Sequence, residues 1–98
     1  MSYFYMYILK CYDGSYYIGH TDNIEQRISQ HNQGKISGYT SKRRPVECVH
    51  ISKFTTRDEA FQAERKIKGW SRAKKEALIR EDWQFLIDYS KKQKMKKE

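Results

Sequence analysis

Two runs of aromatic, β-branched and long apolar residues, without the spacing of a helix, open the chain. They cover residues 3–12 and 16–19, and the turn-forming residues Asp13, Gly14 and Ser15 lie between them. Two such runs joined by a short turn are typical of a β-hairpin. The pattern therefore predicts that the fold begins with two antiparallel strands.

Apolar residues with helical spacing follow the hairpin. Ile24, Ile28 and His31 recur at i, i+4 and i+7, which predicts a short amphipathic helix. Asp22 and Glu25 stand three residues apart, in the order of a capping box. We expect Asp22 to begin this helix.

The remaining segments predict one more strand and further helices. Residues 34–45 are polar and aperiodic, which predicts a basic loop with room for one helical turn. Residues 46–54 are rich in strand formers. The helical segments after them are a helix from the capping box Thr56-x-x-Glu59 to about Trp70, a helix capped by Ser71 through about Arg80, and a closing segment near 82–89.

This order of elements predicts an α+β fold, a small three-stranded antiparallel sheet flanked by helices. The expected domain covers residues 1–90. Residues 91–98 are expected to be a basic, disordered tail.

Composition narrows the class of protein. A chain of 98 residues suffices for one core, and 38% hydrophobic with 33% charged residues is typical of a soluble globular protein. No apolar stretch approaches the roughly 20 residues that span a bilayer, and the N-terminus lacks a secretory signal. We therefore expect a cytoplasmic protein without a membrane partner, in which Cys11 and Cys48 stay reduced.

The net charge of +8 is unevenly distributed. Residues 91–98 contain five lysines and one glutamate, so half of the excess positive charge lies in the last eight residues. Lys and Arg gain free energy when they release counterions from a polyphosphate, which favours a nucleic-acid partner. A tail that only raises solubility explains the charge equally well.

Tyr7 and Tyr17 in the hairpin are the first candidates for chemistry, although eight tyrosines in the chain favour strand packing for any one of them. Their relation depends on the turn. A two-residue loop pairs residues 7 and 20 and puts the two tyrosines on opposite faces of the sheet. A three-residue loop over 13–15 pairs residues 11 and 17 and puts the tyrosines on one face. We expect the three-residue loop or an equivalent bulge.

Arg27 and His31 stand four residues apart, so their side chains lie on one face of the first helix and could reach a common phosphate. From spacing alone, an ordinary solvated arginine and a half-buried histidine are the better explanation. Spacing therefore does not establish a site.

Glu64 is unusual for its place on the helix over 56–70. At 100° per residue it projects toward the apolar side of that helix. A buried carboxylate needs a cation, hydrogen bonds or a metal, and a carboxylate with several waters suits Mg²⁺ or Mn²⁺. An ion pair with Arg27 or another cation is the competing interpretation. The apolar side is defined by Ala60, Ala63, Ile67 and Trp70.

Taken in order, these residues form the pattern of a known family. Tyr5-Met6-Tyr7 is followed after nine residues by Tyr17-Ile18-Gly19, and then by Arg27, His31 and Glu64. The chain resembles the GIY-YIG nuclease superfamily over about residues 3–82, with Tyr5 and Met6 where the name motif has Gly and Ile. It is similar in particular to the small stand-alone bacterial members of that superfamily (UPF0213-like).

The resemblance implies a metal-dependent endonuclease that hydrolyses phosphodiester bonds in DNA, with a preference for particular DNA structures and a link to repair or recombination. It implies Tyr7 as the general base that deprotonates water, and Tyr17 as the residue that orients this water or relays its proton. A tyrosine has a reference pKa of about 10 and needs nearby cations to act as a base. Arg27 and the metal would supply them.

The same resemblance gives roles to the other motif residues. Arg27 would stabilise the charge that grows on the phosphate oxygens. Glu64 would hold a single Mg²⁺ or Mn²⁺ ion, which polarises the phosphate and stabilises the leaving oxygen. His31 would position the phosphate or the base.

Further residues are candidates for contacts with nucleic acid. Gly19 fits a place where the substrate or another backbone approaches the strand closely. Lys42, Arg43 and Arg44 are candidates for phosphate contacts, which position DNA, favoured over RNA, without reading its sequence.

Two other classes of function stay open. One is a catalytically weak nucleic-acid-binding module. The other is a docking domain for a protein subunit that supplies targeting, which exposed Trp83 and Phe85 would favour. The oligomeric state is left open by the sequence.

Overall fold

The computed structural model describes residues 2–96 of the 98; residues 1, 97 and 98 lie outside the described part. The chain forms two compact units, Met1–Lys68 and Gly69–Glu98. The sequence predicts one domain over residues 1–90. Because the structure divides into two units, each unit is described by itself.

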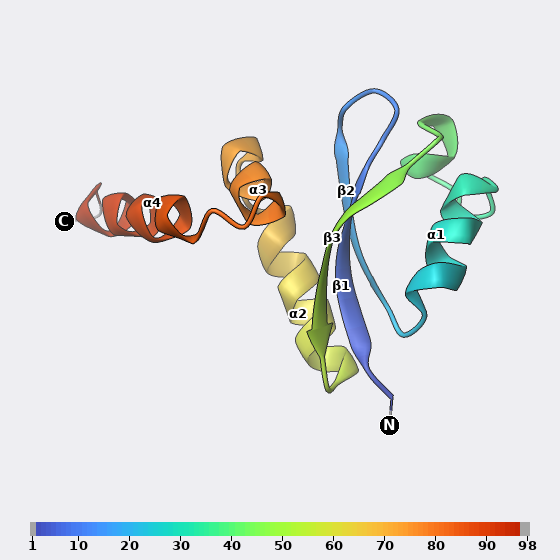
Figure 1. Cartoon of the computed structure of the whole chain (residues 1–98), viewed down its shortest axis with the longest axis horizontal. Coiled ribbons are helices and arrows are strands. Elements are labelled where there is room, and N and C mark those ends of the chain that lie inside the picture. The colour runs from blue at the N-terminus through green and yellow to red at the C-terminus, as the bar shows by residue number, and fades with distance from the viewer. Residues whose placement is uncertain (1, 97–98) are drawn as a thin grey trace. The chain divides into compact units, whose positions relative to one another are not determined.

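The first unit is built on a three-stranded antiparallel sheet (Figure 1). The strands are β1 (Phe4–Lys10), β2 (Tyr16–Thr21) and β3 (Glu47–Phe54), in the order β2-β1-β3. β1 is therefore central and β2 is an edge strand. The predicted α+β fold with a small antiparallel sheet and flanking helices is confirmed.

The hairpin has a three-residue loop, but the loop covers residues 12–14 rather than the expected 13–15. Tyr7 pairs with Gly19 and Leu9 pairs with Tyr17, so the expected pairing of residues 11 and 17 is wrong by two positions. The reason is Gly14, whose φ of 85° is the left-handed conformation that ends a three-residue loop. A shift by two preserves the alternation of side chains, so both tyrosines still lie on one face.

Two helices cover opposite faces of this sheet (Figure 1). α1 (Ile24–Asn32) packs on the face that carries Tyr7 and Tyr17, and α2 (Arg57–Lys68) packs on the other face, against β1 and β2. The core on the α1 side contains Tyr7, Leu9, Cys11 and Val46, against which Tyr17, Ile24, Ile28 and Cys48 pack.

The helix starts follow the capping rules, with one correction. Asn23, not Asp22, caps α1, because its side chain accepts a hydrogen bond from the backbone N–H of Gln26. Asp22 instead pairs with Arg57 at 3.4 Å. The capping box at α2 is as expected, since Thr56 Oγ1 accepts from the N–H of Glu59.

The loop between α1 and β3 contains one short 3₁₀ helix, η1 (Thr40–Lys42). Asn32 forms hydrogen bonds with Val46, at the end of the loop that precedes β3. The Asn32 side chain accepts from the Val46 N–H at 2.8 Å and donates to the Val46 carbonyl at 3.2 Å. These two bonds hold the end of α1 against the start of β3.

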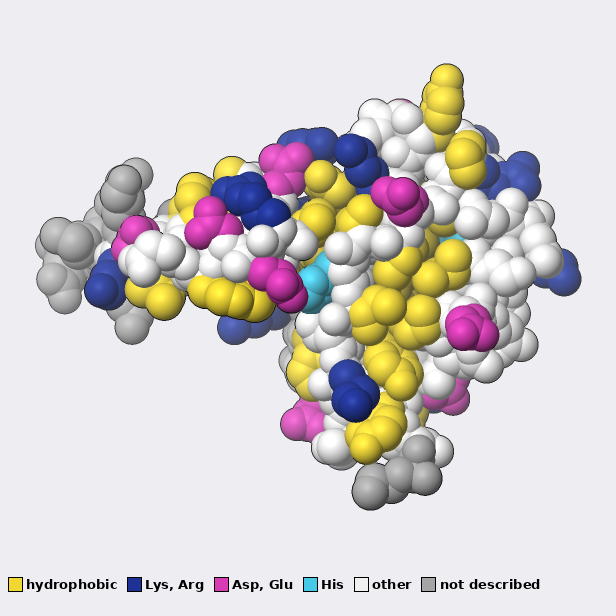
Figure 2. Space-filling view, viewed as in Figure 1, with side chains coloured by type: hydrophobic (Ala, Val, Ile, Leu, Met, Phe, Trp, Pro, Cys, Tyr) yellow, Lys and Arg dark blue, Asp and Glu magenta, His cyan; other side chains and the backbone are white. Residues whose placement is uncertain are grey.

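The face of the sheet under α1 is only partly covered. Hydrophobic side chains form a band over the strands on the side seen in Figure 2. Ile51 of β3, which pairs with Tyr7 and so shares its face, is exposed. The sheet therefore stays open beside the tyrosines.

The second unit contains α3 (Arg72–Ile79) and α4 (Trp83–Lys96). Ser71 caps α3 as expected, and the Asp82 carboxylate accepts from the N–H of Phe85 at the start of α4. α4 is longer than the expected closing segment. Residues 91–96, expected as a disordered tail, continue it, because Lys, Gln and Met are strong helix formers.

No helix in the described part of the chain is long and apolar enough to cross a membrane. Cys11 and Cys48 are free thiols, as the sequence predicts.

The two hydrogen bonds between Asn32 and Val46, which form a clip between α1 and β3, should contribute measurably to stability. We expect Asn32→Ala to lower the free energy of unfolding by about 1–3 kcal/mol, because it leaves the Val46 N–H and C=O without partners. Urea denaturation followed by circular dichroism measures this change. Gln33→Ala, which removes only an exposed bond to Ser29, is the control and should change it by less than about 0.5 kcal/mol. Equal effects of the two substitutions would contradict the clip.

Candidate active site

A chain of three buried polar side chains forms the centre of the first unit. Tyr7 Oη lies 3.0 Å from His31 Nε2, and His31 Nδ1 lies 2.7 Å from Thr40 Oγ1. Each of the three residues is at most 1% exposed. The chain connects β1, α1 and η1, so it links the central strand to the loop through the helix.

Burial keeps both ends of the Tyr7–His31 pair neutral. Burial raises the pKa of Tyr7 well above its usual value of 10, the nearby Tyr17 and Glu64 raise it further, and only Arg27 among the larger influences lowers it. Burial and then the charge of Arg27 lower the pKa of His31 below 6.5. Arg27 lowers the pKa of Tyr7, in the expected direction, but without a metal the desolvation of the phenolate outweighs the arginine.

A neutral imidazole donates from one nitrogen and accepts at the other. Either Tyr7 donates to Nε2 while Nδ1–H donates to Thr40, or Thr40 donates to Nδ1 while Nε2–H donates to Tyr7. Both arrangements satisfy the ring, and they differ in where the tyrosine proton points.

Gly19 makes room for Tyr7. A Cβ atom at position 19 would lie 2.5 Å from Tyr7 Oη and 2.6 Å from Tyr7 Cζ. Real Cβ atoms do not approach so closely. A close approach at Gly19 therefore exists, but the approaching group is the Tyr7 ring of the neighbouring strand and not the expected substrate or backbone.

Tyr17 lies against the same cluster, half-buried. Its ring centroid is 6.4 Å from that of Tyr7 and 5.1 Å from that of His31, and it stacks on Tyr39. The two tyrosines and His31 are therefore brought together on the α1 side of the sheet.

Tyr5 and Met6, which replace the Gly and Ile of the first motif, lie in regular strand pairing. Tyr5 pairs with Thr21 on one side and Lys53 on the other. No positive φ is found at either position. The altered motif therefore needs no glycine conformation to place Tyr7.

Glu64 is buried, as helical spacing predicts, but it lies on the opposite side of β2. It is 8% exposed and belongs to α2. His20 Nδ1 donates to its Oε1 at 2.7 Å, and Lys68 Nζ donates to its Oε2 at 2.9 Å. Glu64 therefore forms the ion pairs that the competing interpretation predicts, but its partners are His20 and Lys68 and not Arg27.

The charge of Glu64 is stabilised by these partners. Burial raises the pKa of its carboxyl, but the hydrogen bonds and positive charge of His20 and Lys68 outweigh burial and hold the pKa below its usual value. The charge of Glu64 reaches Tyr7, where it raises the pKa of the hydroxyl. Two parts of the candidate site thus face each other across one edge strand.

The donor set at Glu64 fits a weakly held divalent ion. No group of three or more His, Cys, Asp or Glu side chains that could hold a metal is found among residues 2–96. Glu64 and His20 offer one carboxylate oxygen and one imidazole nitrogen, and waters or substrate oxygens would fill the remaining positions. That composition suits a divalent ion that keeps several waters rather than a structural zinc site.

The cationic candidates differ in what they already bind. Arg27 is half-buried and has no recorded ion pair within the described residues. Lys42 is exposed. Arg43 pairs with Asp13 at 3.0 Å and lies over the Tyr39 ring. Arg44 donates to the carbonyls of Ser41 and Asn32. Arg27 and Lys42 therefore keep the charge that a phosphate could meet, whereas Arg43 and Arg44 hold the loop.

Two candidate site residues, Thr40 and His20, were not predicted from the sequence. Thr40 lies in an aperiodic loop, and no local pattern marks it as the partner of a histidine nine residues earlier. His20 follows Gly19 in β2, so strand alternation places it on the face opposite Tyr7. This alternation and the predicted burial of Glu64 on the helix that covers the same face would together predict that His20 and Glu64 lie close to each other.

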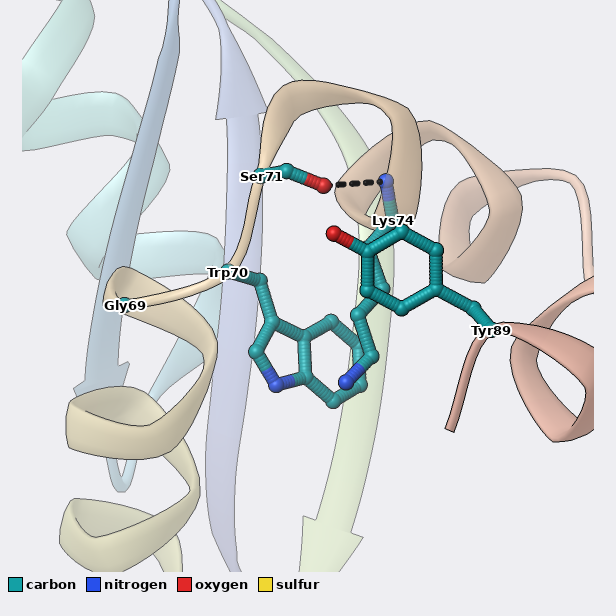
Figure 3. A pocket seen from close by; sticks show the side chains of 5 residues that line it. All are labelled: Gly69, Trp70, Ser71, Lys74 and Tyr89. Carbon is teal, nitrogen blue, oxygen red and sulfur yellow. Dashed lines mark hydrogen bonds between the residues drawn. The ribbon is translucent and has the colours of Figure 1, made fainter. Parts of the chain in front are cut away.

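A pocket in the second unit has a lysine in its own wall (Figure 3). It is lined by Gly69, Trp70, Ser71, Lys74 and Tyr89. Lys74 Nζ lies 4.2 Å from the centroid of the Trp70 ring and 5.4 Å from that of Tyr89. This cation–π contact fastens α4 to α3.

Comparison with known proteins gives one consistent result. A family model described as the GIY-YIG catalytic domain matches residues 3–77. The UPF0213 protein of Staphylococcus saprophyticus is 49% identical over 77 residues, which are 79% of this chain and 94% of that protein. The UPF0213 protein of Bacillus pumilus is 47% identical over 79% of each chain.

Solved structures agree with these matches. A solution NMR structure of a UPF0213 protein from Bacillus halodurans has a TM-score of 0.52 at 42% identity, over 79% of this chain and 82% of that chain. One of a protein from E. faecalis has a TM-score of 0.55 at 44% identity, over 82% of this chain and 84% of that chain.

The space at Gly19 can be tested by a cycle of substitutions. We expect Gly19→Ala to lower the free energy of unfolding by about 1–3 kcal/mol, because the new methyl group displaces the Tyr7 ring. In a Tyr7→Leu background, which removes the hydroxyl and Cζ, the same substitution should cost less. Thermal and urea unfolding of the four proteins give the coupling. Equal costs in both backgrounds would contradict a contact between the two positions.

Proposed function

The chain belongs to the GIY-YIG family of nuclease domains, and we propose that it is a metal-dependent endonuclease that hydrolyses phosphodiester bonds in DNA. The observation that carries the proposal is the buried chain Tyr7–His31–Thr40, in which two motif residues are joined at 3.0 Å. Polar groups so deeply buried are costly unless they are paired, and perturbed pKa values of this kind cluster at functional sites.

Tyr7 and His31 act together as the base. In the competent arrangement Nδ1–H of His31 donates to Thr40, and the Tyr7 hydroxyl donates to Nε2. As Tyr7 Oη takes a proton from the attacking water, the hydroxyl proton passes to Nε2, so the water becomes hydroxide and His31 becomes imidazolium. No free phenolate forms, which removes the difficulty of the raised Tyr7 pKa.

Arg27 and Tyr17 serve the phosphate and the water. Arg27, with no recorded ion pair in the described part of the chain, binds the phosphate oxygens and stabilises the charge that grows on them. Tyr17 stands beside both Tyr7 and His31, where it orients the water.

Glu64 acts from the other side of β2. A divalent ion, Mg²⁺ or Mn²⁺, would polarise the phosphate and stabilise the leaving oxygen when it is bound there. Because β2 is an edge strand, only one strand separates Glu64 from Tyr7. We place the scissile phosphate along the free edge of β2, within reach of both sides.

The finer features of the substrate belong to the same proposal. DNA is favoured over RNA, with a preference for particular structures and a role in repair or recombination, and Lys42 is the loop residue best placed for a phosphate contact. Lys and Arg side chains border the region of α1 and the loop after it on the face seen in Figure 2. The two free thiols support a cytoplasmic location. The nuclease domain extends over residues 1–90.

A docking role is the weaker candidate. Trp83 is 55% exposed, which favours a partner surface on α4. Phe85, however, is half-buried and stacks on Tyr89, so only one of the two expected anchors is free.

Cleavage tests the proposal directly. We expect duplex, nicked, flapped or branched DNA to be cut in the presence of Mg²⁺ or Mn²⁺, and Glu64→Gln to lower the rate about 100-fold or more. Electrophoresis of end-labelled substrates measures the rate, with Glu59→Gln on the exposed side of α2 as the control. Binding that survives Glu64→Gln without any cutting by the unaltered protein would identify a binding module instead.

The pH dependence distinguishes the relay from a free phenolate. Because the pKa of His31 is lowered from 6.5, its neutral form is present above that value, and the relay predicts a rate that is flat from about pH 7 to 9. As the pH falls through the lowered pKa, His31 is protonated from solvent and the rate falls. A phenolate base, with the Tyr7 pKa raised above 10, would instead give a rate that rises about tenfold per pH unit over the same range.

A further inference from the structure

We propose that His20 is a second protein ligand of the divalent ion held by Glu64, and that its imidazole nitrogen makes the site prefer Mn²⁺ to Mg²⁺. This inference rests on the metal site of the proposed function and names its other half. It concerns a residue that the family motif residues, Tyr7, Tyr17, Gly19, Arg27, His31 and Glu64, do not include.

The two donor atoms are already placed as neighbours. His20 Nδ1 lies 2.7 Å from Glu64 Oε1. Two adjacent ligands of a six-coordinate ion with bonds of about 2.1 Å lie about 3.0 Å apart. An ion can therefore replace the proton between the two atoms with a small separation of the side chains. In the tautomer with its hydrogen on Nε2, the imidazole presents the Nδ1 lone pair to the ion.

The surroundings hold the imidazole in this orientation. His20 lies in β2, and its ring contacts the Phe61 ring one turn before Glu64 on α2, with centroids 5.4 Å apart. The two side chains are 24% and 11% exposed, so water can reach the pair and complete the coordination. Both residues are thus fixed by regular secondary structure, which suits a binding site.

The ion pair between Lys68 and Glu64 shows that the Glu64 carboxylate can hold a cation. Its ammonium group lies 2.9 Å from Oε2, and its side chain is 52% exposed. The flexible side chain can move aside or stay on Oε2, which leaves Oε1 and Nδ1 for the ion. Glu64 thus already gathers positive charge on both oxygens.

The nitrogen donor decides the preference between the two metals. Mg²⁺ binds oxygen almost exclusively. Mn²⁺ also suits carboxylate and water ligands, but as a first-row transition metal it accepts an imidazole nitrogen more readily than Mg²⁺ does. A carboxylate alone would bind both ions similarly. A carboxylate with an imidazole should favour Mn²⁺.

Metal binding by the full chain, without DNA, tests the proposal. We expect titration calorimetry to give tighter binding of Mn²⁺ than of Mg²⁺, and His20→Gln to weaken Mn²⁺ binding at least about tenfold while Mg²⁺ binding changes little. Pulsed EPR of bound Mn²⁺ should show coupling to a nitrogen nucleus, and this signal should vanish in His20→Gln. His50→Gln, which alters the other half-buried strand histidine, should leave both readings unchanged.

Two other outcomes would overturn the proposal, and they distinguish a failure of His20 as a ligand from a failure of the metal site itself. Unchanged Mn²⁺ affinity and nitrogen coupling in His20→Gln would remove His20 from the site, while loss of binding in Glu64→Gln would still support the metal at Glu64. Unchanged binding in Glu64→Gln would remove the metal site itself, and the proposal about His20 with it. Circular dichroism of each variant confirms that it is folded.

Discussion

The constraint on which the structure depends is the burial of the Tyr7 hydroxyl. Tyr7 lies on the central strand, where its ring fills the core, and only 1% of the residue is exposed. A buried hydroxyl needs a partner. His31 meets this need, Thr40 then meets that of His31, and Gly19 leaves the space in which the ring lies. One buried oxygen thus fixes the position of α1, the course of the loop and one residue of the neighbouring strand.

The two sides of the candidate site have opposite electrostatic character. On the α1 side burial keeps Tyr7 and His31 neutral. On the α2 side hydrogen bonds from His20 and Lys68 keep Glu64 charged. The hydrolysis proposed above would use the neutral Tyr7–His31 pair to move a proton and the charged Glu64 to hold a divalent cation. Because β2 is the edge strand, both can meet a phosphate that approaches from outside the sheet.

Local patterns predicted most of the fold and the burial of Glu64. Strand alternation, capping boxes and helical spacing act within a few residues, so they located all three strands, and Glu64 followed from the positions of Ala60 and Ile67 on the same helix. The hairpin register differs from the expected one because the left-handed conformation of Gly14 ends the loop at residue 14. The partners Thr40 and His20 were missed because residues far apart in the chain or in an irregular loop meet only through the tertiary fold. The charge of residues 91–96 predicts disorder, but their helix propensity outweighs it and α4 continues through them.

The arrangement of protons on His31 tests the account most directly. ¹⁵N NMR of the imidazole ring distinguishes a nitrogen that carries hydrogen from one that accepts a hydrogen bond, and it can be recorded at neutral pH on the protein alone. The proposed relay predicts a neutral His31 with its proton on Nδ1, donated to Thr40, and with Nε2 accepting from Tyr7. A proton on Nε2, or a His31 charged at pH 7, would contradict the relay, because Nε2 could then take no proton from Tyr7.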